Sequence, residues 1–269
     1  MLKRIKENYK QNKKSIKKAY KAQKRDGRSV YKKNKNAARE EYYLNREELY
    51  LENGEAPPVN PPQRSLLEEI GNAITHGLGA AFAVLALILM LIRSDSGIKL
   101  TAALIYFFGL FVAFSMSCLY HSFRHGSSLK RLFRRFDYSS IYLLIGATFA
   151  PILLVYFGGT TGTVFFVIQW AIIATGVSLI GVFGPARLRF IHIPLYVLLG
   201  WSGLILMPEM LSRTPAFFAF TLGGGIVYTL GLIPFAIKAK VSHFIWHLFV
   251  LAGAAVQWVG IYIYVYAAM

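Results

Sequence analysis

The sequence predicts an all-α integral membrane protein, a bundle of seven transmembrane helices with its N-terminus inside and its C-terminus outside. Three observations support this fold class. The chain of 269 residues is 55% hydrophobic and yet carries a formal net charge of +17, a combination that is rare in soluble domains. Seven apolar segments follow residue 65. The basic residues around these segments gather on one side of the expected membrane.

The first element is a basic arm, residues 1–51, which we predict to be cytoplasmic and either helical or disordered. Residues 1–64 hold 18 of the 30 Lys and Arg residues. A thin apolar stripe runs through Ile5, Tyr9, Ile16 and Tyr20. Such an arm can lie on anionic lipid headgroups, contact RNA phosphates, or stay solvated and fix the topology by its charge. We expect anionic lipid headgroups as its partner and no specific nucleic acid.

A proline-rich linker, residues 52–64, is expected to separate the arm from the seven-helix domain, residues 65–269. Residues 52–63 read ENGEAPPVNPPQ, and proline favours an extended chain. The first 65 residues contain no apolar run, so we expect no cleavable signal peptide. The single cysteine, Cys118, excludes an intramolecular disulfide.

Each apolar segment is about 18 to 25 residues long, which lets a helix cross a hydrocarbon core of ~30 Å. The segments lie near residues 70–92, 98–121, 137–157, 162–183, 190–207, 216–237 and 242–266. With the N-terminus inside, 27 Lys and Arg residues fall on the inner side, whereas Arg93, Lys99 and Arg213 fall outside. Because basic residues concentrate on the cytoplasmic side, we expect a multi-pass cell-membrane protein with a cytoplasmic N-terminus.

The histidines carry the strongest functional signal. In this topology all six fall at the inner ends of spans: His76, His121, His125, His192, His243 and His247. His243 and His247 are spaced i, i+4, which brings two imidazoles to one helix face as in many metal sites. The alternative is an interfacial aromatic belt anchored by Trp246. His243 and His247, together with His121, could bind zinc through three imidazoles and leave the fourth coordination position of the metal open.

Two further polar residues lie at the same depth. Ser117 precedes His121 by one helical turn and shares its face. Asp137 is the first residue of the third predicted span, and its role has two interpretations. It can pair with Arg134 or Arg135 as a topological charge, or it can bind and orient the water of a metal site and take its proton.

The remaining histidines are expected to play other roles. His125 and His192 lie close to arginines, and we expect both at the membrane interface. His76 is expected to be a buried, hydrogen-bonded histidine, with metal ligation as the alternative.

Four motifs, taken together and in order, resemble the hemolysin III family. They are Glu69-x-x-Asn72-x-x-Thr75-His76-Gly77, Ser117-x-x-x-His121, Arg135-x-Asp137-x-Ser139-x-Ile141-Tyr142, and His243-x-x-x-His247. These proteins are bacterial relatives of the progestin and adipoQ receptors, which include the adiponectin receptors. The resemblance covers residues 65–269 and leaves out the basic arm.

The resemblance implies seven helices with the N-terminus inside and a zinc ion near the inner face. It implies that the metal is held by His121, His243 and His247, with Asp137 and Ser117 close to the zinc-bound water. In the eukaryotic relatives this arrangement is linked to hydrolysis of ceramide-like lipid amides.

Several functions are compatible with these features. The first is a zinc-dependent membrane hydrolase of a lipid amide or ester, in which Asp137 is the general acid/base and Ser117 a hydrogen-bond donor to the oxyanion. The second is a seven-helix sensor or receptor with structural zinc. The third is membrane-damaging, hemolysin-like activity, which seven resident spans disfavour. A metal or proton transporter is disfavoured because the spans contain too few acidic residues. The sequence does not determine the oligomeric state.

Overall fold

The computed structural model describes residues 2–22, 30–31, 34–38, 41, 61–237 and 239–267. The chain divides into two compact units, Met1–Val59 and Asn60–Met269. Most of the predicted linker, from residue 52 to residue 60, lies outside the described residues. The domain boundaries at residues 51 and 64 therefore stay predictions.

The first unit contains helix α1, Leu2–Ala22. Ile5, Tyr9 and Ile16 are half-buried along one side of the helix. A small hollow on this side is lined by Tyr9, Lys13, Ile16, Tyr31, Lys35 and Ala38, and Ala38 is only 8% exposed. The apolar stripe of α1 thus packs against the short helical segment at residues 34–38 and against Tyr31.

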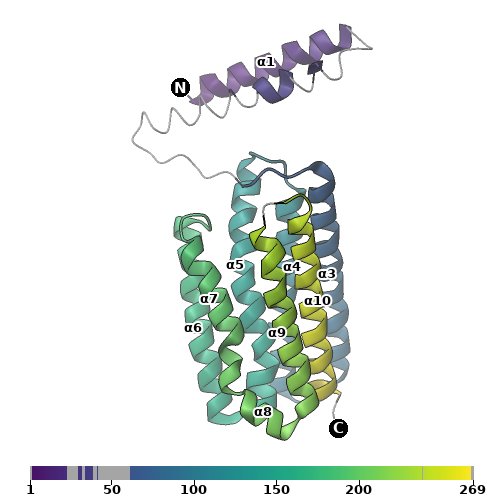
Figure 1. Ribbon diagram of the computed structural model, residues 1–269, viewed down its shortest axis with the longest axis vertical. Helices are drawn as coiled ribbons and strands as arrows, with labels where there is room; N and C mark the ends of the chain where they lie inside the picture. The colour runs from purple at the N-terminus through teal and green to yellow at the C-terminus, as the bar shows by residue number, and fades with distance from the viewer. Residues whose placement is uncertain are drawn as a thin grey trace. The chain divides into compact units, whose positions relative to one another are not determined.

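The second unit is a bundle of helices that run side by side (Figure 1). Its long helices are α3 (Leu66–Ile92), α4 (Gly97–Ser122), α5 (Ser128–Pro151), α6 (Gly159–Phe183), α7 (Arg189–Trp201), α9 (Pro215–Ala236) and α10 (Ser242–Ile261). Shorter elements extend or join them: η1 (Ile152–Phe157), η2 (Ser202–Ile205), α8 (Met207–Arg213) and η3 (Tyr262–Tyr266). The described residues include no strand, and the all-α prediction is confirmed.

In the part of the chain that the structure describes, six helices are long and apolar enough to cross a membrane, so the chain is a multi-span membrane protein. The span predicted near residues 190–207 is different, because it is broken. Arg189–Ile205 and Met207–Arg213 pass the same test together, but they are bent by 46° relative to each other. The break follows from Pro208 in the first turn of α8, since proline has no amide hydrogen for a continuous helix. Counting this bent pair as one span gives seven.

Helix α5 begins earlier than predicted. The third span was expected to begin near residue 137, but the helix starts at Ser128. Its N-cap is Ser127, whose Oγ accepts a hydrogen bond from the Lys130 amide at 3.0 Å. The added turns carry Lys130 into the bundle, where it is fully buried.

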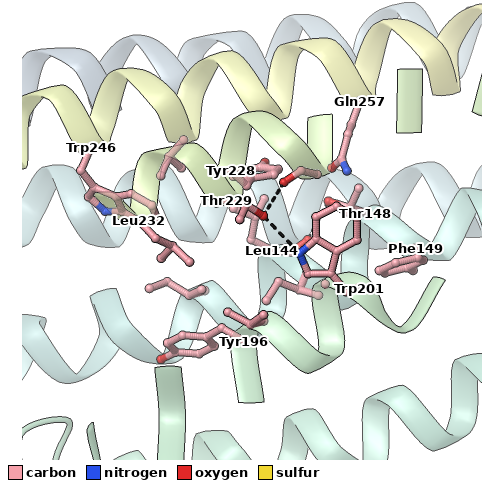
Figure 2. Close-up of a pocket in the computed structure, with 16 residues that line it drawn as sticks. Leu144, Thr148, Phe149, Tyr196, Trp201, Tyr228, Thr229, Leu232, Trp246 and Gln257 are labelled. Atoms are coloured by element: carbon pink, nitrogen blue, oxygen red, sulfur yellow. Dashed lines mark hydrogen bonds between the residues drawn. The ribbon is translucent and has the colours of Figure 1, made fainter. Parts of the chain in front are cut away.

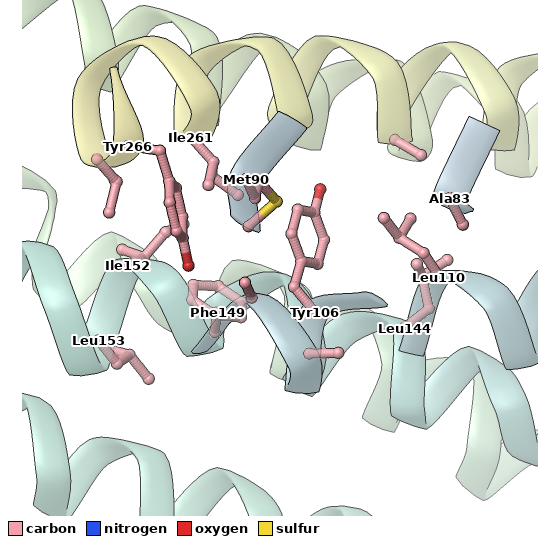
Figure 3. Close-up of a cluster of buried hydrophobic side chains, with 14 of the residues drawn as sticks. Ala83, Met90, Tyr106, Leu110, Leu144, Phe149, Ile152, Leu153, Ile261 and Tyr266 are labelled. Carbon is pink, nitrogen blue, oxygen red and sulfur yellow. The ribbon is translucent and has the colours of Figure 1, made fainter. Parts of the chain in front are cut away.

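The core lies between α3, α4, α5 and α10 and includes Tyr106, Leu110, Ile152 and Ile261 (Figure 3). Small residues let the backbones approach closely. A Cβ on Gly109 of α4 would lie 2.7 Å from the carbonyl oxygen of Leu143 on α5. Close packing of this kind fixes neighbouring helices against one another, so that the first turns of α3 and α5 and the last turn of α4 lie at the same end of the bundle.

Candidate metal centre

Three histidines meet where α3, α5 and α10 begin and α4 ends. His121 comes from α4, and His243 and His247 come from the first turns of α10. One ligand atom from each lies within 4.8 Å of the others, so the three could hold a metal ion. The Nε2 atoms of His243 and His247 are 3.2 Å apart. Two ligands at ~2.0–2.1 Å from a tetrahedral zinc would be separated by about 3.3 Å, so this pair fits a shared ion.

The tautomer of His121 is set by Glu69 of α3. His121 Nδ1 lies 2.6 Å from Glu69 Oε2, and a carboxylate can only accept a hydrogen bond. The proton is therefore on Nδ1. The Nε2 atom of His121 is buried and has no hydrogen-bond partner in the described part of the chain, which leaves its lone pair directed into the site.

His247 is held in the same way by a different acceptor. Its Nδ1 lies 3.3 Å from the backbone oxygen of Asn72 on α3. Because a carbonyl oxygen also only accepts, Nδ1 carries the proton and Nε2 presents its lone pair toward His243. His121 and His247 are 3% and 1% exposed. Two buried imidazoles thus present bare nitrogens to one place, which is how metal-binding histidines are oriented.

Glu69 is itself fixed by a buried cation. Its second oxygen, Oε1, accepts a hydrogen bond from Lys130 Nζ at 2.8 Å. The Lys130 side chain is fully buried and that of Glu69 is 13% exposed. The ammonium also lies 4.8 Å from the centre of the Tyr120 ring, a cation–π distance. One carboxylate therefore connects α3, α4 and α5 at the level of the histidines.

The roles of Glu69, Asn72 and Lys130 were not predicted from the sequence. The signal for the first two was present, because Glu69, Asn72 and His76 are spaced three and four residues apart and so share one face of α3. Lys130 had no such signal, since its partner Glu69 lies 61 residues away in the chain.

The two residues expected to take part in chemistry lie beside His121. Ser117 is buried one turn before it on α4. Asp137 is half-buried on α5 and interacts with the Ser117 side chain and with His121. The carboxylate and the hydroxyl are therefore at the edge of the histidine cluster.

The other three histidines have different surroundings. His76 is buried and its ring stacks on that of His247, with centroids 3.7 Å apart. Neither of its nitrogens has a hydrogen-bond partner of good geometry in the described part of the chain, and it is outside the group of three that could hold a metal. His125 Nε2 lies 3.0 Å from the backbone oxygen of Pro61. His192 is 1% exposed, and its Nδ1 lies 3.0 Å from the Tyr142 hydroxyl, so its ring packs inside the bundle; its expected place at the membrane interface stays a prediction.

A cavity of about 130 Å³ lies between α5, α7, α9 and α10 (Figure 2). Its wall is mainly aliphatic and aromatic, with a few polar groups such as Thr148, Thr229 and Gln257. In this wall, Trp201 Nε1 of α7 donates a hydrogen bond to Thr229 Oγ1 of α9 at 3.1 Å. Trp246, next to His247 on α10, also lines it. The cavity and the histidine cluster therefore share α10.

Comparison with known proteins gives consistent matches over the bundle. Residues 64–258 match the family described as Haemolysin-III related. "Hemolysin-3" of Bacillus cereus is 35% identical over 203 residues, covering 74% of this chain and 92% of that protein. "Hemolysin-3 homolog" of Bacillus subtilis (strain 168) is 34% identical over 197 residues, covering 71% and 91%. The human "Monocyte to macrophage differentiation factor" is 26% identical over 230 residues, covering 83% and 95%.

Proposed function

Because this chain belongs to the Haemolysin-III related family, we propose that it is a zinc-dependent hydrolase of a lipid amide or ester, with its site at the inner face of the cell membrane. In this proposal the bundle has seven spans, the bent pair of α7 and α8 being one of them, and the N-terminus is cytoplasmic. His121, His243 and His247 hold the zinc.

The observation that carries the proposal is the orientation of the imidazoles. Glu69 and the backbone of Asn72 hold the protons of His121 and His247 on Nδ1, so that Nε2 carries no proton on either ring. Imidazole is a preferred ligand of zinc, and three imidazoles with one open position are the donor set of a catalytic zinc site. A purely structural zinc site usually has four protein ligands, whereas the group that could hold a metal has three members among the described residues.

A zinc ion in this site supplies Lewis-acid chemistry, because it polarises a carbonyl group and makes water easier to deprotonate. The protein supplies the other parts. The Asp137 carboxylate accepts the proton of the attacking water and later gives it to the leaving amine or alcohol. The Ser117 hydroxyl donates a hydrogen bond to the substrate carbonyl oxygen, on which negative charge develops. Glu69 and Asn72 keep the imidazoles in place while charge changes nearby.

The cavity supports a lipid as the substrate. Its lining is mainly apolar, which suits an acyl chain. Trp246 and Val250 of α10 line it and flank His247 along the helix. In our proposal the acyl chain occupies this cavity, and the amide or ester bond lies at the histidine cluster.

The direct test combines metal analysis with an activity screen. The purified full-length protein is analysed for zinc per chain and assayed against long-chain lipid amides and esters. We expect about one zinc per chain and turnover that a chelator abolishes and zinc restores. His125→Ala is the matched control, since His125 lies outside the cluster, and it should keep both properties. Zinc without turnover on any lipid would contradict the hydrolase and favour a sensor with structural zinc.

The names of the bacterial relatives favour a second candidate function. Two of them are called Hemolysin-3 or its homolog, which suggests membrane damage. Leakage of a dye from liposomes that contain the purified protein tests this candidate. Leakage that is independent of His121 would separate it from the zinc-dependent activity.

A further inference from the structure

The basic arm offers a charged surface that the proposed hydrolase does not use. Helix α1 contains nine Lys and Arg residues and one acidic residue, Glu7, within 21 residues. At 1.5 Å per residue it is about 31 Å long. The matched family begins only at residue 64, so the role of α1 has to be inferred from its own residues.

The lysines of α1 are concentrated on one face. With 3.6 residues per turn, six of the lysines whose side chains the structure describes fall within an arc of about 100°: Lys3, Lys6, Lys10, Lys13, Lys14 and Lys17. All are exposed except Lys13, which is half-buried at the edge of the apolar stripe. We call this arc the lysine face. Lys18 and Arg4 lie outside this arc, about 40° and about 80° beyond its edge at Lys14.

The apolar stripe beside the lysine face already packs against other residues of the arm. Tyr9 and Ile16 pack toward Tyr31 and Ala38. The apolar stripe is therefore partly covered, and the exposed surface of α1 is dominated by positive charge. A helix of this kind binds a polyanion through charge, and its apolar side chains need not insert deeply.

We infer that the lysine face docks on the surface of an anionic bilayer. A flat membrane contacts one side of a helix, and the six lysines lie on one side. The arm belongs to the same chain as a multi-span domain, so a bilayer is present at high effective concentration. Each lysine close to an anionic surface strengthens binding by about fivefold.

RNA fits the same face less well. The lysine face has no arginine, the residue that binds phosphate and guanine through two parallel hydrogen bonds. It also has no aromatic ring on which a base could stack, since Tyr9 lies in the apolar stripe. The lysine face therefore offers only ammonium groups, which act as point charges. Mobile lipid headgroups can pair with such charges without a fixed geometry.

The test measures the distance of α1 from the lipid surface in the full-length protein. A fluorescent donor is attached at Gln11→Cys in a Cys118→Ala background, because Gln11 is exposed and lies outside the lysine face. The protein is placed in nanodiscs of phosphatidylcholine, alone or with one third phosphatidylglycerol, which carry a headgroup-labelled acceptor lipid. We expect more energy transfer in the anionic discs. Raising NaCl from ~0.1 M to ~1 M shortens the Debye length from about 10 Å to about 3 Å and should remove the difference.

A pair of variants with equal charge change makes the test specific. Lys10→Glu with Lys17→Glu alters the lysine face, whereas Arg4→Glu with Lys18→Glu makes the same change in net charge outside this arc. The first pair should weaken docking by at least about 25-fold, from the loss of two lysines alone, and the second by clearly less. Equal transfer in both kinds of disc, or equal effects of both pairs, would overturn the inference. It would also be overturned if a short single-stranded RNA bound α1 in neutral discs more tightly than the anionic lipid does.

Discussion

Replacing Glu69 by Gln tests the arrangement that orients the metal ligands. The substitution keeps the size of the side chain but removes the charge that accepts from His121 Nδ1 at 2.6 Å and from Lys130 Nζ at 2.8 Å. Partners that orient a metal-binding histidine typically contribute ~10–100-fold to metal affinity, which is about 1.4–2.7 kcal/mol. We therefore expect Glu69→Gln to weaken zinc binding by this factor.

The same substitution leaves the Lys130 ammonium buried without its carboxylate. Breaking a buried ion pair by removing one partner costs about 3–5 kcal/mol of stability, so the single variant should also unfold more easily. The double variant Glu69→Gln with Lys130→Met removes both charges. It should recover much of the stability while its zinc affinity remains low, because His121 still lacks the carboxylate.

Two measurements separate these effects. Zinc affinity is measured by competition with a chelator, and stability by thermal unfolding of the metal-free protein in detergent. Glu68→Gln is the matched control, since Glu68 lies next to Glu69 on α3 but pairs with Arg64 at 3.9 Å. If Glu69→Gln binds zinc as tightly as the unmodified protein, or if the double variant regains full affinity, Glu69 does not orient His121.

Four further predictions concern the ligands, the chemistry, the arm and the topology. His121→Ala, His243→Ala and His247→Ala should each lower zinc affinity by orders of magnitude, since two protein ligands remain; an empty site in His76→Ala with an intact one in His121→Ala would show that the ligand assignment is wrong. Asp137→Asn should keep about one zinc per chain but lose turnover, because the amide cannot accept the proton; unchanged hydrolysis would exclude the proposed role. Deletion of residues 1–60 should leave zinc content unchanged, as the three histidines that could hold the metal belong to the second unit; loss of zinc from a folded truncation would contradict this. A reporter fused after Met269 should be detected outside the cell, and a cytoplasmic signal there would refute the proposed orientation.

The sequence predicted the bundle well because each membrane helix must satisfy its own backbone hydrogen bonds over the hydrocarbon core. Length and hydropathy therefore identified the helices one at a time. They failed at Leu206, where Pro208 and a short 3-10 segment break the helix without lowering its hydropathy. They also failed at Ser128, where a polar first turn extends α5 beyond the apolar run.

The candidate site likewise has one part that the sequence predicted and one part that it did not. The spacing of His243 and His247 is local, and the sequence brought both to one face of a helix. Joining them to His121 across the chain needed the expected topology and the family resemblance. The contacts that orient the ligands, from Glu69 to His121 and to Lys130, connect residues 52 and 61 positions apart. No periodicity encodes such pairings, because they arise only when α3, α4 and α5 pack together.

The broken span also affects the surrounding lipid through hydrophobic mismatch. Helix α7 has 13 residues and η2 has 4, so together they rise about 28 Å. The neighbouring α6 has 25 residues and rises about 38 Å. Up to the bend at Leu206, lipids next to α7 therefore meet a shorter helix than lipids next to α6, because α8, which completes this span, is bent away by 46°. A bilayer accommodates a short wall by thinning. Since α7 forms part of the cavity wall, the thinnest membrane around the bundle is expected beside the cavity.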